Sequence, residues 1–324
     1  MKIMVTGGAG FIGSHLCDKY TKEGHEVICL DNFMNGDLRN IRHLLHCRSF
    51  KLIKGDIRNI ELLEKLMMDV DVVFHLAAQI HVDRSIIEPR LTYDVNVMGT
   101  QNILEMARLC DTKRVIYAST SEVYGSACQV PINEEHPLNA PHPYGASKIA
   151  ADRMCHSYMQ TYGMDIAILR FFNIFGPRQK DLGYGGVISI FSRRVLNNTP
   201  PIIYGDGEQT RDYTYIDDAI NAYDLVLNHN NPINEPINFG TGQEISIVAL
   251  ANKIIEINKC NGNGNASLKP VFIEKRIGEV ERLIADANKA KQVLGWTPQF
   301  KFEEGLYKFF QWYRNYGQEA RIEI

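Results

Sequence analysis

Residues 1–31 read MKIMVTGGAGFIGSHLCDKYTKEGHEVICLD, and this stretch decides the fold. An apolar run at 3–5 leads into the glycine-rich turn at 6–13, and a helical pattern follows as far as Gly24. A second apolar run at 27–30 ends at Asp31. This order predicts a strand, a tight turn, a helix and a second strand, which together form one βαβ unit.

The glycines and the terminal acid of this unit predict a dinucleotide site. Early glycines let the backbone approach a pyrophosphate, Gly13 lets the helix pack closely, and the helix N-terminus offers unpaired N–H groups. Asp31 follows Gly13 by 18 residues, where its carboxylate can accept both ribose hydroxyls and repel a 2′-phosphate. Asn32 and Phe33 supply no cation to reverse that repulsion. We therefore expect NAD rather than NADP, bound by Gly7, Gly10, Phe11, Ile12, Gly13, Asp31 and Asn32.

Composition narrows the class of protein. The 324 residues are 45% hydrophobic and 23% charged, as in an ordinary globular protein, and the net charge of −3 gives no footprint for nucleic acid. No apolar run reaches the roughly 18 residues that span a bilayer. Seven scattered cysteines without a CxxC spacing give no metal site. The chain enters a strand at once, so we expect no signal peptide and a cytoplasmic location.

Strands and helices alternate as far as residue 170. Apolar runs at 50–53, 70–76 and 115–117 predict strands, and patterns at 62–66 and 90–109 predict helices. We expect an α/β fold, a Rossmann-type doubly wound parallel sheet, whose ligands lie at the carboxyl ends of the strands. Residues that follow the strand ends are further candidates for the cofactor site: Asp56, Ile57, Leu76, Ala77 and Ala78.

The second half of the chain is less regular. From about residue 171 prolines and glycines interrupt the alternation. We therefore expect an NAD-binding domain at 1–170 and a smaller, irregular α/β substrate-binding domain at 171–324, with parts of about 212–242 returning to the first domain.

A second motif, Pro143-Tyr144-Gly145-Ala146-Ser147-Lys148, carries candidate chemistry. Pro143 suits the first turn of a helix, which places Tyr144 and Lys148 on one face. A tyrosine is a poor base at neutral pH, but a nearby ammonium favours its phenolate form and lowers its pKa. We therefore expect Tyr144 to be a catalytic base and Lys148 to support it and to contact the nicotinamide ribose.

These motifs together resemble the extended short-chain dehydrogenases/reductases that act on nucleotide sugars. Further matching stretches are Ser119–Gly125, Arg170–Pro177, Gly205–Gly207, Thr210–Tyr213, Asn238–Gly242 and Leu294–Trp296. The resemblance implies that Thr120 bonds the sugar 4-hydroxyl, Tyr144 removes its proton, and a hydride passes from C4 to NAD. It also implies that Asn173 holds the sugar or its phosphate and that Arg211 and Arg276 bind the diphosphate.

The residues after Thr120 separate the reactions of this family. Epimerases usually carry no acid there, whereas 4,6-dehydratases carry Asp-Glu or Ser-Glu, and this chain has Ser121-Glu122. Oxidation at C4 makes H5 acidic, so a carboxylate can remove it before the 6-hydroxyl leaves. Glu122 then serves as base and as acid, or Ser121 relays a proton. We expect a nucleotide-sugar 4,6-dehydratase, with an N-acetylglucosamine nucleotide as one candidate substrate.

Alternatives remain open at this point. They are a nucleotide-sugar 4-epimerase, a UDP-glucuronate-type decarboxylase, and an NAD sensor without catalysis, although sensors typically lack the tyrosine or the lysine. The nucleotide base is equally open. The resemblance also implies a homodimer formed through the segments 90–109 and 144–162.

Overall fold

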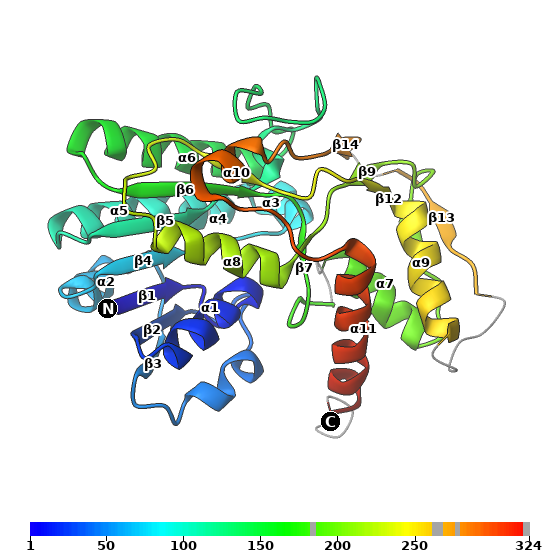
Figure 1. Ribbon diagram of the computed structural model, residues 1–324, viewed down its shortest axis with the longest axis horizontal. Coiled ribbons are helices and arrows are strands. Elements are labelled where there is room, and N and C mark those ends of the chain that lie inside the picture. Colours follow the sequence, from blue (N-terminus) through cyan, green and yellow to red (C-terminus); the bar gives the residue numbers. More distant parts are fainter. Residues whose placement is uncertain (182–185, 261–267, 276–278, 320–324) are drawn as a thin grey trace.

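The computed structural model describes residues 1–181, 186–260, 268–275 and 279–319. Its centre is a parallel sheet of seven strands in the order β11-β6-β5-β4-β1-β2-β3, which confirms the predicted fold class (Figure 1). The strand order changes direction between β1 and β4, since β2 and β3 lie on one side of β1 and β4 to β6 on the other. Doubly wound sheets bind their ligands at such a point. The strands are β1 (Lys2–Thr6), β2 (Glu26–Asp31), β3 (Phe50–Lys54), β4 (Val72–His75), β5 (Arg114–Ala118), β6 (Ile166–Phe171) and β11 (Ile237–Phe239).

Helices cover both faces of the sheet, because the central strands are apolar on both sides. One buried cluster joins the sheet to α1 (Phe11–Lys22), α8 (Ile216–Leu227) and α10 (Asn288–Leu294). The other joins it to α2 (Ile60–Met67), α5 (Gly99–Leu109) and α6 (Pro143–Tyr162). The glycine turn follows β1 and lies at the carboxyl end of the central strands in this three-layer arrangement.

The second part of the chain builds a smaller lobe, on the right in Figure 1. Three helices, α7 (Val187–Leu196), α9 (Ile247–Cys260) and α11 (Phe302–Glu319), share a core rich in aromatic side chains. Short strands complete the lobe: β7 (Ile174–Phe175), β8 (Ile202–Tyr204), β9 (Thr210–Arg211), β10 (Thr214–Tyr215), β12 (Ile245–Ser246), β13 (Val271–Ile273) and β14 (Arg282–Leu283). Between them the chain returns to the central sheet at β11, which pairs with β6.

The helix predicted at 90–109 is divided. After α3 (Val82–Ile87) come α4 (Pro89–Tyr93), a π-helical turn η3 (Asp94–Met98) and then α5. The buried Asn96 in this turn accepts from the N–H of Gln79 at 2.7 Å and donates to the carbonyl of Gln79 and to Ser147 Oγ, both at 2.9 Å. A π-turn often marks a functional region. Here it ties the loop after β4 to helix α6.

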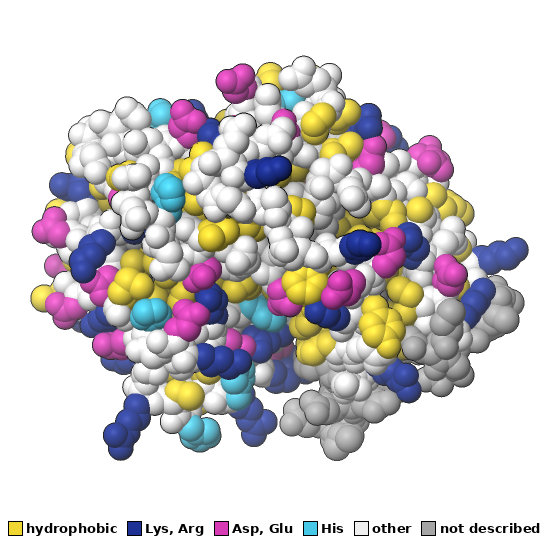
Figure 2. All heavy atoms as spheres, in the orientation of Figure 1, with side chains coloured by type: hydrophobic (Ala, Val, Ile, Leu, Met, Phe, Trp, Pro, Cys, Tyr) yellow, Lys and Arg dark blue, Asp and Glu magenta, His cyan; other side chains and the backbone are white. Residues whose placement is uncertain are grey.

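The surface carries both signs of charge. On the face shown in Figure 2, acidic and basic side chains are interspersed and form no broad basic area. None of the helices in the described part of the chain has the length and apolar character needed to cross a membrane. Three single-turn 3₁₀ helices complete the structure: η1 (Leu38–Asn40), η2 (Arg42–Leu44) and η4 (Ser121–Val123).

Candidate active site

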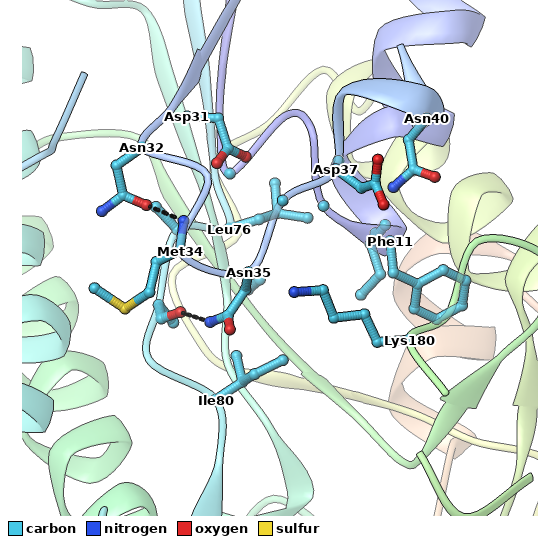
Figure 3. Close-up of a pocket in the computed structure, with 18 of the residues that line it drawn as sticks. Phe11, Asp31, Asn32, Met34, Asn35, Asp37, Asn40, Leu76, Ile80 and Lys180 are labelled. Carbon is cyan, nitrogen blue, oxygen red and sulfur yellow. Dashed lines mark hydrogen bonds between the residues drawn. The ribbon is translucent and has the colours of Figure 1, made fainter. Parts of the chain in front are cut away.

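A cavity of about 550 Å³ opens at the carboxyl edge of the sheet, between the two lobes (Figure 3). It is lined by every residue that the sequence suggested for the cofactor: Gly7, Gly10, Phe11, Ile12, Gly13, Asp31, Asn32, Asp56, Ile57, Leu76, Ala77, Ala78, Tyr144 and Lys148. Their individual contacts with a cofactor remain predictions. The structure does bring them to one surface from five separate stretches of the chain.

The glycine turn has room for backbone only. Gly7 has φ of +71°, and its N–H donates to the carbonyl of Leu30 at 2.8 Å. A Cβ on Gly13 would lie 2.3 Å from the carbonyl oxygen of Gly7. Helix α1 begins directly after Gly10, and no side chain caps its N–H groups. An unfilled helix N-terminus at a glycine cradle suits a pyrophosphate, so these residues fit a dinucleotide.

Asp31 is held from both sides of the turn. Its Oδ2 accepts the Ala9 N–H at 2.9 Å, and its Oδ1 accepts the Phe33 N–H at 2.8 Å. Burial raises the pKa of Asp31, partly opposed by these two N–H groups and by the charge of Lys180. Each carboxylate oxygen keeps a lone pair for a ribose hydroxyl.

Lys180 is a cation that the neighbouring sequence of Asp31 could not reveal. It comes from the second half of the chain and extends into the cavity in Figure 3. Asn32 and Phe33 indeed supply no cation, but Lys180 approaches Asp31 from a distant part of the sequence.

Asp56 also lines the cavity, but its pKa is shifted in the opposite direction from that of Asp31. Arg58 donates to both its oxygens at 2.9 and 2.8 Å, and Asn32 Nδ2 donates to Oδ2 at 2.8 Å. The hydrogen bond from Arg58 is the main cause that lowers the pKa of Asp56 to about 2, against the effect of burial. Asp56 is therefore a fixed anion, and its predicted bond to an adenine amino group remains a prediction.

Tyr144 and Lys148 lie on the first two turns of α6 and are both buried. The Lys148 ammonium donates to the carbonyl of Ala118 at 2.6 Å and lies 4.4 Å from the ring centre of Tyr117. Burial lowers the pKa of Lys148 to about 8. The pKa of Tyr144 is raised by burial and by the charge of Glu122, although a hydrogen bond with Thr120 opposes this. The ammonium of Lys148 is turned to Ala118, and its expected effect on the pKa of Tyr144 remains a prediction.

Thr120, Ser121 and Glu122 follow strand β5. Thr120 caps the η4 turn, and its Oγ1 accepts the Glu122 N–H at 3.2 Å. The carboxylate of Glu122 accepts from His142 Nε2 at 3.2 Å. Burial favours the neutral acid, but the hydrogen bond from His142 and the charge of Arg211 prevail and lower the pKa of Glu122. Glu122 is therefore an ionised carboxylate beside Tyr144. Ser121 is buried, and its relay role remains a prediction.

The predicted substrate residues come from the second half of the chain. Arg211 on β9 pairs with Glu279 at 3.1 Å and lies close enough to Glu122 to affect its pKa. Asn173, with φ of +22°, donates to the carbonyl of Asp212 at 3.0 Å. Arg276 lies outside the described residues. Arg211 thus lies on the side of the site on which Glu122 lies, and Asn173 is bonded to the residue that follows Arg211.

Sequence reasoning missed several polar groups at this site. Asn35, His81, Ser119 and Arg178 line the cavity, and the buried Ser119 hydroxyl has no hydrogen-bond partner. His142 was also missed, although its position directly before Pro143 marks it as the residue that caps the Tyr144 helix. In the parts of the chain that are described, no three His, Cys, Asp or Glu side chains gather as metal ligands would.

Comparison with known proteins identifies the family. A family model described as GDP-mannose 4,6 dehydratase matches residues 4–309. A putative UDP-glucose 4-epimerase from Methanocaldococcus jannaschii is 41% identical over 317 residues, which cover 97% of this chain and 98% of that protein. UDP-glucuronic acid decarboxylase 1 from Xenopus tropicalis is 36% identical over 318 residues, covering 97% of this chain and 72% of that protein.

Solved structures agree with the sequence relatives. The crystal structure of a dTDP-glucose 4,6-dehydratase from Streptomyces venezuelae, with NAD bound, matches with a TM-score of 0.90 at 33% identity over 97% of both chains. The relatives differ in the reactions that their names give, but each of them matches nearly the whole of this chain. This chain therefore belongs to the extended short-chain dehydrogenase/reductase family of nucleotide-sugar dehydratases and epimerases.

Proposed function

We propose that this protein is an NAD-dependent nucleotide-sugar 4,6-dehydratase, which converts a nucleoside diphosphate hexose to its 4-keto-6-deoxy form. The observation that carries the proposal is Glu122, an ionised carboxylate beside Tyr144 and within the field of Arg211. The first step, oxidation at C4, needs only a base and a hydride acceptor. A carboxylate beside that base is useful only if another proton must move.

The residues divide the reaction between them. Tyr144 takes the proton of the sugar 4-hydroxyl while Thr120 holds that hydroxyl. When bound beside these residues, NAD would supply the hydride acceptor for C4 and a positive charge that favours the Tyr144 phenolate. Glu122 removes H5, which the new carbonyl has made acidic. The 6-hydroxyl then takes a proton, from Glu122 directly or through Ser121, and leaves as water. The hydride then returns to C6 and a proton to C5, so the net change is loss of one water.

A 4-epimerase is the second candidate, because the 41% identical archaeal relative carries that name. In that reaction the 4-keto sugar turns over in the site and the hydride returns to the other face of C4. Glu122 would then move no proton. The two candidates share Tyr144 and Lys148 and differ only at Glu122.

The test is product analysis with a panel of UDP, GDP and dTDP sugars. Loss of one water by mass indicates the dehydratase, loss of carbon dioxide a decarboxylase, and an unchanged mass with inverted C4 an epimerase. Tyr144→Phe should abolish formation of reduced cofactor. Glu122→Gln should still oxidise C4, but water loss should fall by about 10²- to 10⁴-fold, as expected when a general base is removed.

A matched control is Glu135→Gln, which makes the same chemical change at an exposed position outside the site. It should leave both steps unchanged. If Glu122→Gln loses water at the unmutated rate, the dehydratase proposal fails, and the epimerase becomes the better assignment.

A further inference from the structure

His142 occupies an unusual position for a histidine. It is the N-cap of α6, two residues before Tyr144, and only 6% of it is exposed. Its Nδ1 accepts the N–H of Gly145 at 3.1 Å, and its ring lies nearly parallel to that of Tyr144, with an interplanar angle of 15°. N-caps are usually Ser, Thr, Asp or Asn, whose side chains satisfy the same N–H group. The cap alone therefore does not require an imidazole.

The cap fixes the tautomer of the imidazole. Because an N–H group points at Nδ1, that nitrogen must carry a lone pair, and the ring proton is on Nε2. The Nε2 atom lies 3.2 Å from Glu122 Oε2. A second proton on Nδ1 would face the Gly145 N–H and break the cap. In this arrangement His142 therefore presents its Nε2–H group to Glu122.

We propose that His142 is a positioning residue for Glu122, holding one carboxylate oxygen so that the other is left to act on the substrate. This inference rests on the proposed function for its catalytic consequence. Glu122 has no other side-chain hydrogen bond within the described residues. The charged and titratable groups that face it are His142 and Tyr144 from α6 and Arg211 from β9. His142 thus links the cap of the catalytic helix to the second base.

Two substitutions separate the functions of the two ring nitrogens. His142→Asn places an amide oxygen near the position of Nδ1, which keeps the cap, but its side chain is too short to reach Glu122. His142→Gln places an amide nitrogen near the position of Nε2, which keeps the donor to Glu122 but gives a poor cap. If His142 only capped the helix, His142→Gln would lower the thermal midpoint and the elimination rate more than His142→Asn, which would change both very little.

For the rate of the elimination step we expect the opposite order, with His142→Asn slower than His142→Gln. With the full-length protein and bound NAD, His142→Asn should keep its thermal midpoint and its rate of C4 oxidation, but water loss should fall by about 10- to 100-fold, as for a lost bond to a charged group. The acid limb of its pH profile should move to higher pH, because Glu122 loses a donor. His142→Gln should have a lower thermal midpoint and retain most of the elimination rate. In a Glu122→Gln background, His142→Asn should cause no further loss.

A measurement without turnover separates this inference from the proposed function. Carbon-13 NMR of protein labelled at the glutamate carboxyls follows the titration of Glu122, whose signal is assigned by its absence in Glu122→Gln. The midpoint should lie at higher pH in His142→Asn and near the unmutated value in His142→Gln. An unchanged midpoint in His142→Asn overturns the inference. A raised midpoint, in a protein that removes water from no sugar, supports the positioning role and rejects the dehydratase.

Discussion

Replacement of Asp31 by alanine tests the cofactor site most directly. The carboxylate holds the glycine turn through Ala9 and Phe33, and it faces the place where an adenosine ribose would lie. A hydrogen bond to a charged group contributes about 1.5–3 kcal/mol, so loss of one such bond to the ribose weakens NAD binding by about 10- to 100-fold. The N–H groups of Ala9 and Phe33 also lose their acceptor, which should weaken NAD binding further.

NADP should respond in the opposite direction. In the unmutated protein we expect its 2′-phosphate to meet the buried carboxylate of Asp31 and to be repelled by it. Asp31→Ala removes that charge and leaves Lys180 as a nearby cation. The preference for NAD over NADP should therefore narrow by more than about tenfold. Adding Lys180→Gln should reverse part of the gain for NADP and change NAD binding less.

Titration calorimetry with both cofactors on the unmutated protein and the two variants measures these values. The thermal midpoint without added cofactor controls for damage to the turn. Equal affinity for NAD and NADP in the unmutated protein would refute the position assigned to the ribose. So would an unchanged preference in Asp31→Ala.

Two further predictions concern stability and assembly. Burial, with a smaller effect of the Lys148 charge, lowers the pKa of His75 to about 3, so the folded protein keeps this ring neutral while the unfolded chain protonates it near pH 6.5. Its contribution to stability is complete above that pH and should fall by about 2 kcal/mol at pH 5. Urea unfolding should show a flatter pH dependence in His75→Gln, and equal slopes would contradict the assignment. The predicted homodimer would bury exposed apolar side chains such as Met98, Leu109 and Tyr162. Light scattering should give a dimer that Met98→Glu with Leu109→Glu dissociates, and a monomeric unmutated protein would exclude it.

Local pattern was enough to predict the first half of the fold. The run at 27–30 is the core of β2 (Glu26–Asp31), and Pro143 begins α6 as expected. The π-turn at Asp94–Met98 could not be predicted, because its cause is a tertiary contact of Asn96 with Gln79 and Ser147. The short strands of the small lobe could not be predicted either, since strands of two residues such as β9 leave no periodic pattern.

The site shows the same division between local and distant causes. Tyr144, Lys148 and Glu122 belong to short motifs, so the sequence alone marked them as candidates. Lys180 and Arg211 reach the site from the other lobe, and their effect on Asp31 and Glu122 depends on the folded arrangement. His142 stood beside a recognised motif, but only its two hydrogen bonds reveal which nitrogen faces which group.

The proximity of Tyr144 and Glu122 also imposes an order on the proposed reaction. The negative charge of Glu122 raises the pKa of Tyr144, so two anions side by side are disfavoured. Once Tyr144 has taken the proton of the 4-hydroxyl it is neutral, and that repulsion ends. His142 and Arg211 still hold Glu122 as an anion at this moment, when H5 first becomes acidic. The arrangement therefore suits two proton transfers in sequence, the first to Tyr144 and the second to Glu122. A 4-epimerase needs only the first of them.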